Sequence, residues 1–170
     1  MRAALVFVTV GTDHHKFDRL MTWLENWNGS AELVVQHGSS RPVGGARCHD
    51  FLPHPEMLEL FATADAVVCQ GGPGSIMEAR RAGRLPIVVP RLARYDEVVD
   101  DHQVSFSRRV AELGKIALAE TEHELHTLLD HAVREPDAFT VPPGGGDVGP
   151  AIERFVRLVE QLVSPWRRRG

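Results

Sequence analysis

A glycine-rich turn followed by one carboxylate is the part of this sequence whose residue types are best suited to chemistry. Gly71, Gly72 and Gly74 remove Cβ atoms where a ligand would approach, and the amides around Ser75 open a helical pattern and are free to bind an anion. Glu78 lies one turn further along, where its carboxylate can accept hydrogen bonds from two hydroxyls of an adjacent ribose. The same residues also fit a plain glycine turn whose acid only complements the helix dipole.

The spacing of these glycines excludes two familiar nucleotide sites. It is not GxGxxG, and it follows a late strand rather than the first, which disfavours a nicotinamide cofactor. It is not GxxxxGK[ST] either, which excludes a P-loop kinase. The turn is therefore either a site for a phosphorylated ligand of another class or a plain structural turn, and the spacing alone does not favour one of them.

Two further segments are expected beside this turn, because ligands bind at the carboxyl ends of parallel strands. Gly11 and Thr12 directly follow the first apolar run. Asp101, His102 and Gln103 open a later helical pattern, and the planar amide of Gln103 suits sugar hydroxyls. His102 can bind a phosphate or a hydroxyl, while Asp101 or its neighbour can equally serve as a helix cap.

Candidates for a general base lie in the loop after the first apolar run. His14 and His15 are there, preceded by Asp13, and histidine is the natural proton acceptor near neutral pH. These residues can equally be ordinary surface side chains of a loop. The sequence contains no DxD motif, and Cys48 and Cys69 belong to no CxxC motif, so we expect neither a metal nor a required cofactor.

The elements that must position these residues alternate regularly along the chain. Apolar runs rich in β-branched residues predict strands, and amphipathic patterns predict helices. Thr121 and Glu124 form the signature of a helix-capping box. The alternation predicts an α/β fold, a doubly wound parallel sheet of about six strands. We expect strands over 3–10, 31–36, 46–52, 65–70, 86–90 and 115–119, and helices over 17–27, 55–64, 75–83, 101–114 and 121–133.

Composition and segment boundaries indicate one globular domain with an appendage. The chain has 170 residues, 43% of them hydrophobic, and a net charge of -4, which argues against a protein that coats nucleic acid. No segment approaches the apolar length of a membrane-spanning helix. We expect a Rossmann-like domain over residues 1–135, a Pro/Gly-rich loop over 136–149, and an amphipathic helix with a basic tail over 150–170.

Three blocks of the sequence, in this order, resemble a known family. The segments FVTVGTDHHKFDRL, ADAVVCQGGPGSIMEARRAGRLPIVVP and VDDHQVSFSRRVAELGKI together resemble the C-terminal domain of glycosyltransferase family 28, over roughly residues 5–135. The strongest similarity is to its stand-alone half-enzymes. These are the PssE-type subunit of bacterial exopolysaccharide synthesis and the cytosolic subunit of the eukaryotic two-chain UDP-GlcNAc transferase of N-glycan assembly.

The resemblance implies a role for each of the segments above. The turn at Gly71–Ser75 would receive the diphosphate of a UDP-sugar, Glu78 would hold the ribose, and the segment Asp101–Gln103 would face the sugar. The loop at Gly11 would lie across the cleft. Because Pro73 has no N–H, one phosphate donor is lost, and the family role is carried over most directly to Gly72, Gly74 and Ser75.

The resemblance also implies a partner, because full enzymes of this family have two Rossmann-like halves. We expect the donor-binding half of a GT-B hexosyltransferase, acting with a membrane-anchored subunit that binds a polyprenyl-linked glycan. The protein would be cytoplasmic and peripheral at the inner face of the membrane, with UDP-sugar as substrate and no nucleic acid bound. Three alternatives stay open, namely an enzyme completed by homodimerisation, a non-catalytic nucleotide-sugar-binding or scaffolding protein, and an epimerase of related fold.

Overall fold

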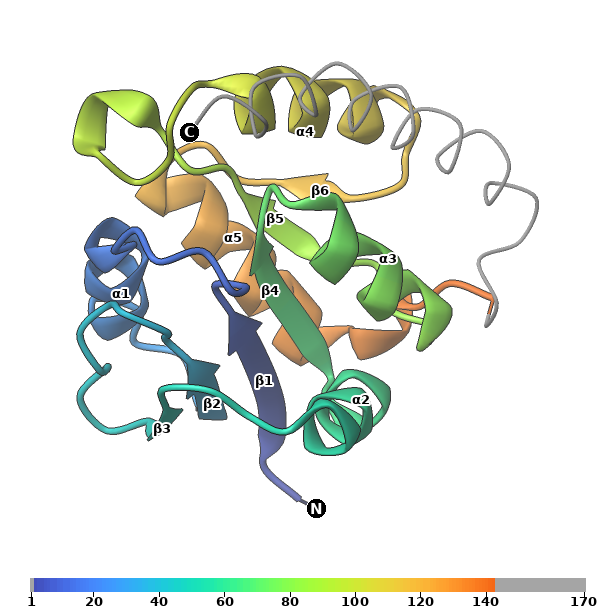
Figure 1. Ribbon diagram of the computed structural model, residues 1–170. Helices are drawn as coiled ribbons and strands as arrows, with labels where there is room; N and C mark the ends of the chain where they lie inside the picture. The colour runs from blue at the N-terminus through green and yellow to red at the C-terminus, as the bar shows by residue number, and fades with distance from the viewer. Residues whose placement is uncertain (1, 143–170) are drawn as a thin grey trace.

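Six parallel strands form a single sheet in the computed structural model, which describes residues 2–142 (Figure 1). The strands are β1 (Ala4–Thr9), β2 (Ala31–Gln36), β3 (Arg47–His49), β4 (Ala66–Gln70), β5 (Ile87–Val89) and β6 (Ala117–Leu118). The helices are α1 (Asp18–Glu25), α2 (His54–Thr63), α3 (Pro73–Arg81), α4 (His102–Glu112) and α5 (Glu122–Arg134), with 3-10 turns η1 (Ala93–Tyr95) and η2 (Pro136–Phe139).

The strand order β3-β2-β1-β4-β5-β6 confirms the doubly wound sheet expected from the sequence. The chain builds outward from β1 to β3 and then returns to the other side of β1, where it adds β4, β5 and β6. At this reversal the loops after β1 and β4 lead to helices on opposite faces. A crevice at the carboxyl ends of β1 and β4 is the expected place for a ligand in such a sheet.

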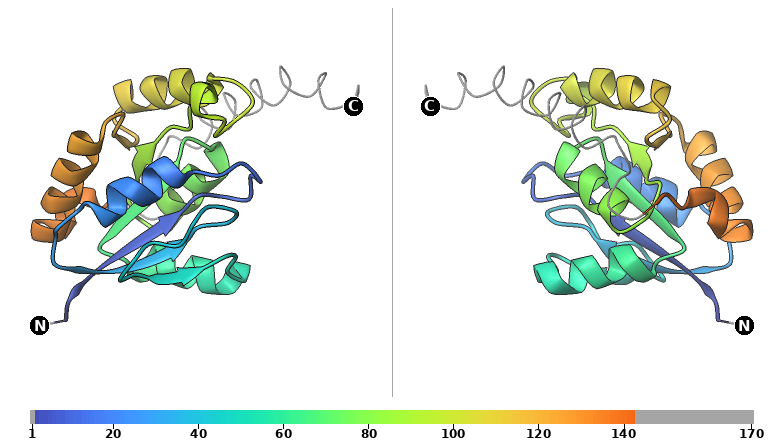
Figure 2. Two further views of the ribbon diagram at one scale, coloured as in Figure 1. Left: turned by 90° about the vertical axis from the view of Figure 1, so that its left-hand side faces the viewer. Right: turned by 90° about the vertical axis from the view of Figure 1, so that its right-hand side faces the viewer.

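The first apolar run is continuous because both of its faces are covered. Val6 and Val8 pack in a core with residues of α1 and α5, whereas Phe7 lies in a second core with α2 and α3. Its ring meets that of Phe61 edge-on at 5.1 Å. In the edge views of Figure 2, α5 and α2 lie on opposite sides of the sheet.

Helix termini follow the local sequence signals. The predicted capping box at the start of α5 is present, with Thr121 and Glu124 each bonding the other's backbone N–H. Helix α3 begins at Pro73 rather than at Ser75, because proline already has helical φ and needs no N–H at the first position. Strand β6 is shorter than the predicted run over 115–119.

The packed part of the domain extends beyond the expected boundary at residue 135. Phe139 of η2 is 4% exposed and lies in the core beside α5, and Thr140 pairs with Arg84 in an antiparallel bridge. The predicted amphipathic helix and basic tail over 150–170 fall outside the described residues. None of the helices within residues 2–142 combines the length and hydropathy that crossing a bilayer requires.

Candidate functional site

The loops after β1 and β4 meet at the crevice, beside the first turn of α3. A Cβ atom at Gly11 would lie 2.3 Å from the side chain of Gln70 at the end of β4, so the two loops are in contact. Helix α3 has Gly72 as its N-cap residue and therefore no side-chain cap. The first amides of α3, including that of the buried Ser75, are thus left for another acceptor.

The glycines of this turn do not share one role, contrary to the expectation that each opens space for a ligand. A Cβ at Gly71 would lie 2.6 Å from Ser107 Oγ and 3.0 Å from Gln103 Cβ, both on α4. Gly71 therefore permits α4 to pack against the turn. By contrast, a Cβ at Gly74 would meet no atom within 4 Å, so Gly74 is the position that faces open space.

This difference predicts opposite results for two alanine substitutions. Gly71→Ala should lower the free energy of unfolding by about 1–3 kcal/mol, because the added methyl overpacks the contact with α4. Gly74→Ala should leave it unchanged or raise it by up to about 1 kcal/mol, because alanine favours the helix. Urea denaturation of the two variants measures both free energies of unfolding. Equal decreases in the two variants would contradict the assignment of Gly71 to the contact with α4 and of Gly74 to open space.

Glu78 is available for a ligand on one side of its carboxylate. Its Oε1 lies 2.9 Å from His54 Nε2 at the start of α2, and its side chain is 28% exposed. The second oxygen has no hydrogen-bond partner among the described residues. The structure therefore positions Glu78 through His54 and leaves Oε2 free to accept a hydroxyl.

Gln103 acts as a clamp between two loops in this structure. Its Oε1 accepts the N–H of Gly71 and the N–H of Arg91, both at 3.1 Å, and the residue is buried. The amide oxygen expected to meet a sugar hydroxyl is thus used within the protein. Gln103 holds the turn after β4 to the end of β5 and keeps only its NH2 group for a ligand.

The two residues before Gln103 are also engaged locally. Asp101 is the N-cap residue of α4, yet its Oδ1 accepts the N–H of Ala93 at 2.9 Å instead of a first-turn amide. Asp100 instead accepts both the backbone N–H and the ring Nδ1 of His102. These two contacts, the backbone one foremost, lower the pKa of Asp100 against the opposing effect of burial.

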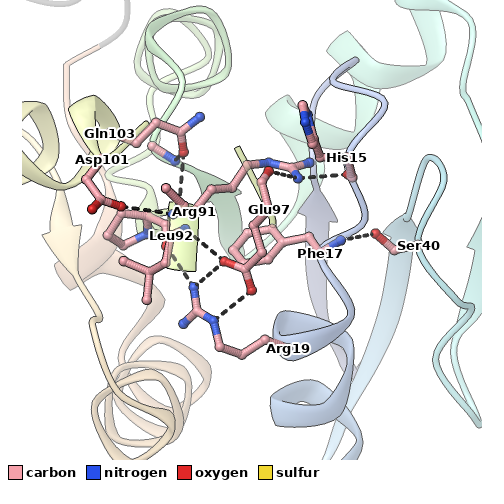
Figure 3. A network of polar contacts seen from close by, with 12 residues as sticks. His15, Phe17, Arg19, Ser40, Arg91, Leu92, Glu97, Asp101 and Gln103 are labelled. Carbon is pink, nitrogen blue, oxygen red and sulfur yellow. Dashed lines mark hydrogen bonds and ion pairs between the residues drawn. The ribbon is translucent and has the colours of Figure 1, made fainter. Parts of the chain in front are cut away.

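The charged residue that organises the crevice, Arg91, was not singled out by the sequence. It is fully buried after β5, and its guanidinium donates to the carbonyl oxygens of Val10, His15 and Glu97, each at 2.9 Å (Figure 3). The guanidinium also lies 4.9 Å from the centre of the Phe17 ring. Burial lowers the pKa of Arg91, while Asp13 and Glu97 act in the opposite direction.

Glu97 extends this network to helix α1. Its carboxylate binds Arg19 through two hydrogen bonds of 2.9 and 2.8 Å and accepts the N–H of Leu92 at 2.9 Å (Figure 3). Arg19 donates in addition to the carbonyl oxygen of Pro90. The loop after β1 and the loop after β5 are therefore held as one unit.

Asp13 and His15 form a hydrogen-bonded pair on the loop after β1. Asp13 Oδ1 accepts the backbone N–H of His15 at 2.8 Å and lies 2.6 Å from its Nδ1. Burial raises the pKa of Asp13, but the bonds from His15 and the charge of Arg91 outweigh it, and the pKa is lowered. A neutral imidazole that donates from Nδ1 to this carboxylate presents Nε2 as its proton acceptor.

One groove in the described part of the chain is lined by none of the residues of the glycine turn. It is a groove of about 840 Å³ between the loop after β1 and the loop after β5. His14 and His15 line one wall, and Tyr95 and Asp96 line the other. The possible ligand atoms of Asp13, His14 and His15 lie within 4.8 Å of one another, and the expectation of no metal stays a prediction.

The structure thus gathers most of the predicted residues into two areas. One is the start of α3, and the other is the groove bordered by His14 and His15. Gly11, Gly72, Gly74 and Ser75 surround the start of α3, and Glu78 lies further along the same helix. Thr12 is exposed on the loop after β1 and has no hydrogen-bond partner in residues 2–142. Arg91 and Glu97 were missed because charged residues in a polar loop are normally solvated, and no local signal indicates their burial.

Comparisons with known proteins agree with this architecture. Residues 5–143 match the model of the glycosyltransferase family 28 C-terminal domain. Among solved structures, Acinetobacter baumannii MurG superposes with a TM-score of 0.56 at 16% identity, over 90% of this chain and 52% of that one. The glycotransferase of kitacinnamycin superposes with a TM-score of 0.55 at 21% identity, over 92% and 39%. These two likenesses concern the fold.

A curated relative supports the same assignment at the sequence level. The UDP-N-acetylglucosamine–N-acetylmuramyl-(pentapeptide) pyrophosphoryl-undecaprenol N-acetylglucosamine transferase of Chlorobium phaeobacteroides is 31% identical over 111 residues. The match covers 61% of this chain and 29% of the relative, so the aligned segment corresponds to less than a third of that enzyme. Because the model of the C-terminal domain spans most of the sequence, the chain belongs to glycosyltransferase family 28 and contains the C-terminal domain of that family.

Proposed function

We propose that this protein is the donor-binding half of a glycosyltransferase that transfers a hexose-type sugar from a UDP-sugar to a polyprenyl-linked glycan. The observation that carries the proposal is the start of α3, which has no side-chain cap and faces open space at Gly74. The helix lies at the crevice where the strand order reverses, and its free amides and positive dipole end favour a diphosphate.

In this proposal the ribose lies further along α3, within reach of Glu78. The free Oε2 of Glu78 accepts one ribose hydroxyl, and Oε1 keeps its bond to His54 while accepting the second. A carboxylate that binds a diol in this way distinguishes a nucleotide from a plain phosphate. The nucleoside diphosphate would therefore run along the first two turns of α3.

The proposed general base is His15, oriented by Asp13. His15 borders the groove, its Nδ1 is held by Asp13, and its carbonyl oxygen is held by Arg91. In the transfer step an acceptor hydroxyl forms a bond to the anomeric carbon, and the bond from that carbon to the diphosphate oxygen breaks. The hydroxyl proton passes to Nε2 of His15, and UDP leaves with the electron pair.

The second half of the active site is proposed to be a separate, membrane-anchored chain that binds the lipid-linked acceptor. Large apolar side chains are exposed at the carboxyl edge of the sheet, where that half would dock. Phe51 after β3 is 58% exposed, and Tyr95 and Val99 after β5 are 55% and 82% exposed. We expect the partner to cover these side chains, because an interface is marked by a continuous apolar surface and not by single exposed residues.

Titration calorimetry with UDP, followed by transfer assays with and without the membrane partner, tests the proposal. We expect UDP to bind the chain alone and to raise its melting temperature with concentration, and transfer to occur only with the partner. Turnover by the chain alone would favour an enzyme completed by homodimerisation. UDP binding without turnover in any pairing would favour a scaffolding protein, and absence of UDP binding would contradict the donor site.

A further inference from the structure

Gln70, the last residue of β4, carries a buried amide that the protein itself does not satisfy. The residue is 8% exposed, and its Oε1 has no hydrogen-bond partner among the described residues. Its Nε2 has no partner there either, but this atom, unlike Oε1, is not fully enclosed, so it is the end of the amide that a ligand can reach. A buried polar group without a partner destabilises a fold, so its presence calls for a physical reason.

Another glutamine in the same sheet shows what a purely structural role looks like. Gln36 is the last residue of β2 and is also buried. Its Nε2 donates to Thr9 Oγ1 at 3.2 Å, and its Oε1 accepts the N–H of Leu52 at 2.9 Å. Both ends of that amide are used within the protein. Gln70 also ends its strand, one register position further along the sheet than Gln36, and differs because both ends of its amide are unpaired among the described residues.

The amide of Gln70 lies in the crevice, between its two glycine turns. A Cβ at Gly11 would come within 2.3 Å of Gln70 Nε2, and a Cβ at Gly72 within 2.8 Å. Gly11 also has a φ of 74°, a conformation that side chains rarely adopt. Gly11 and Gly72 therefore leave room for this amide nitrogen, next to the carboxyl ends of β1 and β4.

We propose that Gln70 is a donor-binding residue whose Nε2 donates a hydrogen bond to the diphosphate of the sugar nucleotide. This inference rests on the proposed function and adds a side chain to a site otherwise made of backbone amides. Pro73 cannot donate at the first position of α3, and Gly72 has no side chain with which to cap it. The amide of Gln70 supplies a donor beside these two positions, without adding a charge.

The competing explanation is that the amide only fills space beneath Gly11 and Gly72. Methionine has nearly the same length and shape and no polar end. If Gln70 only fills space, Gln70→Met should raise the melting temperature, by removing an unpaired buried amide, and should leave ligand binding unchanged. If Gln70 binds the diphosphate, the same variant should be equally stable or more stable and yet bind the ligand more weakly.

The experiment measures UDP and uridine binding to the full chain by calorimetry, with the melting temperature of each variant. We expect Gln70→Met to weaken UDP binding at least about tenfold, the effect of one hydrogen bond to a charged group, and to leave uridine binding unchanged. Gln70→Glu should weaken UDP binding further, because a carboxylate would face the phosphates. Gln36→Met is the matched control, and should lower the melting temperature without changing the affinity of the folded chain for UDP.

The wild-type and variant titrations together distinguish failure of this inference from failure of the proposed function. If the wild-type chain does not bind UDP, both are overturned. If the wild-type chain binds UDP and Gln70→Met binds it equally well, the role of Gln70 is overturned and the donor site stands. The same conclusion follows if Gln70→Met loses as much affinity for uridine as for UDP. Should Gln70→Met fail to fold, Gln70→Asn, which keeps an amide but withdraws it by one methylene, is expected to show the same selective loss of UDP.

Discussion

His15→Gln is expected to bind UDP as tightly as the wild-type chain and to transfer sugar about 100-fold more slowly, or slower still, when the acceptor-binding half is present. Removal of a positioned general base typically costs a factor of this size. Glutamine keeps the backbone N–H that binds Asp13 and the carbonyl oxygen that binds Arg91, so the loop should hold its shape. Initial rates at saturating UDP-sugar, with calorimetry for UDP, measure the two effects separately.

Two neighbours of His15 provide the controls for this result. His14 has a side chain that is 87% exposed, and His14→Gln should leave the rate nearly unchanged. Asp13→Asn removes the carboxylate that orients the ring and should slow transfer about tenfold or more, with UDP affinity retained. Full activity of His15→Gln would place the base on the other half of the enzyme.

Glu78→Ala should weaken UDP binding about 100-fold while leaving stability nearly unchanged. Two hydrogen bonds from ribose hydroxyls to a carboxylate contribute roughly 3 kcal/mol together, which corresponds to this factor. The side chain is partly exposed, and its one hydrogen-bond partner within residues 2–142, His54, is on the surface, so its removal opens no cavity. Calorimetry with UDP and with inorganic pyrophosphate measures the effect, and pyrophosphate affinity should not fall.

The control for this variant is His54→Gln, which removes the partner and keeps the carboxylate. We expect a loss of UDP affinity much smaller than that of Glu78→Ala, because His54 only orients the acid. If Glu78→Ala leaves the UDP titration unchanged, the ribose assignment is wrong, although the diphosphate could still lie at the start of α3. Equal loss of pyrophosphate binding would instead place Glu78 in the structural support of the helix.

The order of the elements could be predicted from the sequence because their signals are local. A run such as residues 3–10 is apolar throughout since both faces of a central parallel strand are covered. The capping box of Thr121 and Glu124 spans four residues and needs no distant partner. Helix α3 began two residues earlier than predicted, within the usual uncertainty of helix ends.

The location of the site could be predicted from the sequence, but the roles of its individual residues could be predicted much less well. A glycine turn after a strand indicates where an anion can bind, and the structure places that turn at the reversal of the sheet. Nothing in the spacing of Gly71 and Gly74 reveals that one faces α4 and the other faces open space. Likewise, Gln103 has the chemistry of a sugar ligand, but its oxygen is occupied by Gly71 and Arg91.

By itself, the sequence determined the fold class and the segments that meet at the carboxyl edge, because burial periodicity and turn chemistry act over a few residues. Only the tertiary structure decided which polar groups are used and which are left free. Arg91 reaches carbonyl oxygens 81 and 76 residues away in the sequence, at Val10 and His15. Gln36 and Gln70 are both buried at the ends of strands, yet residues distant in the sequence satisfy the amide of the first and leave that of the second unpaired among the described residues.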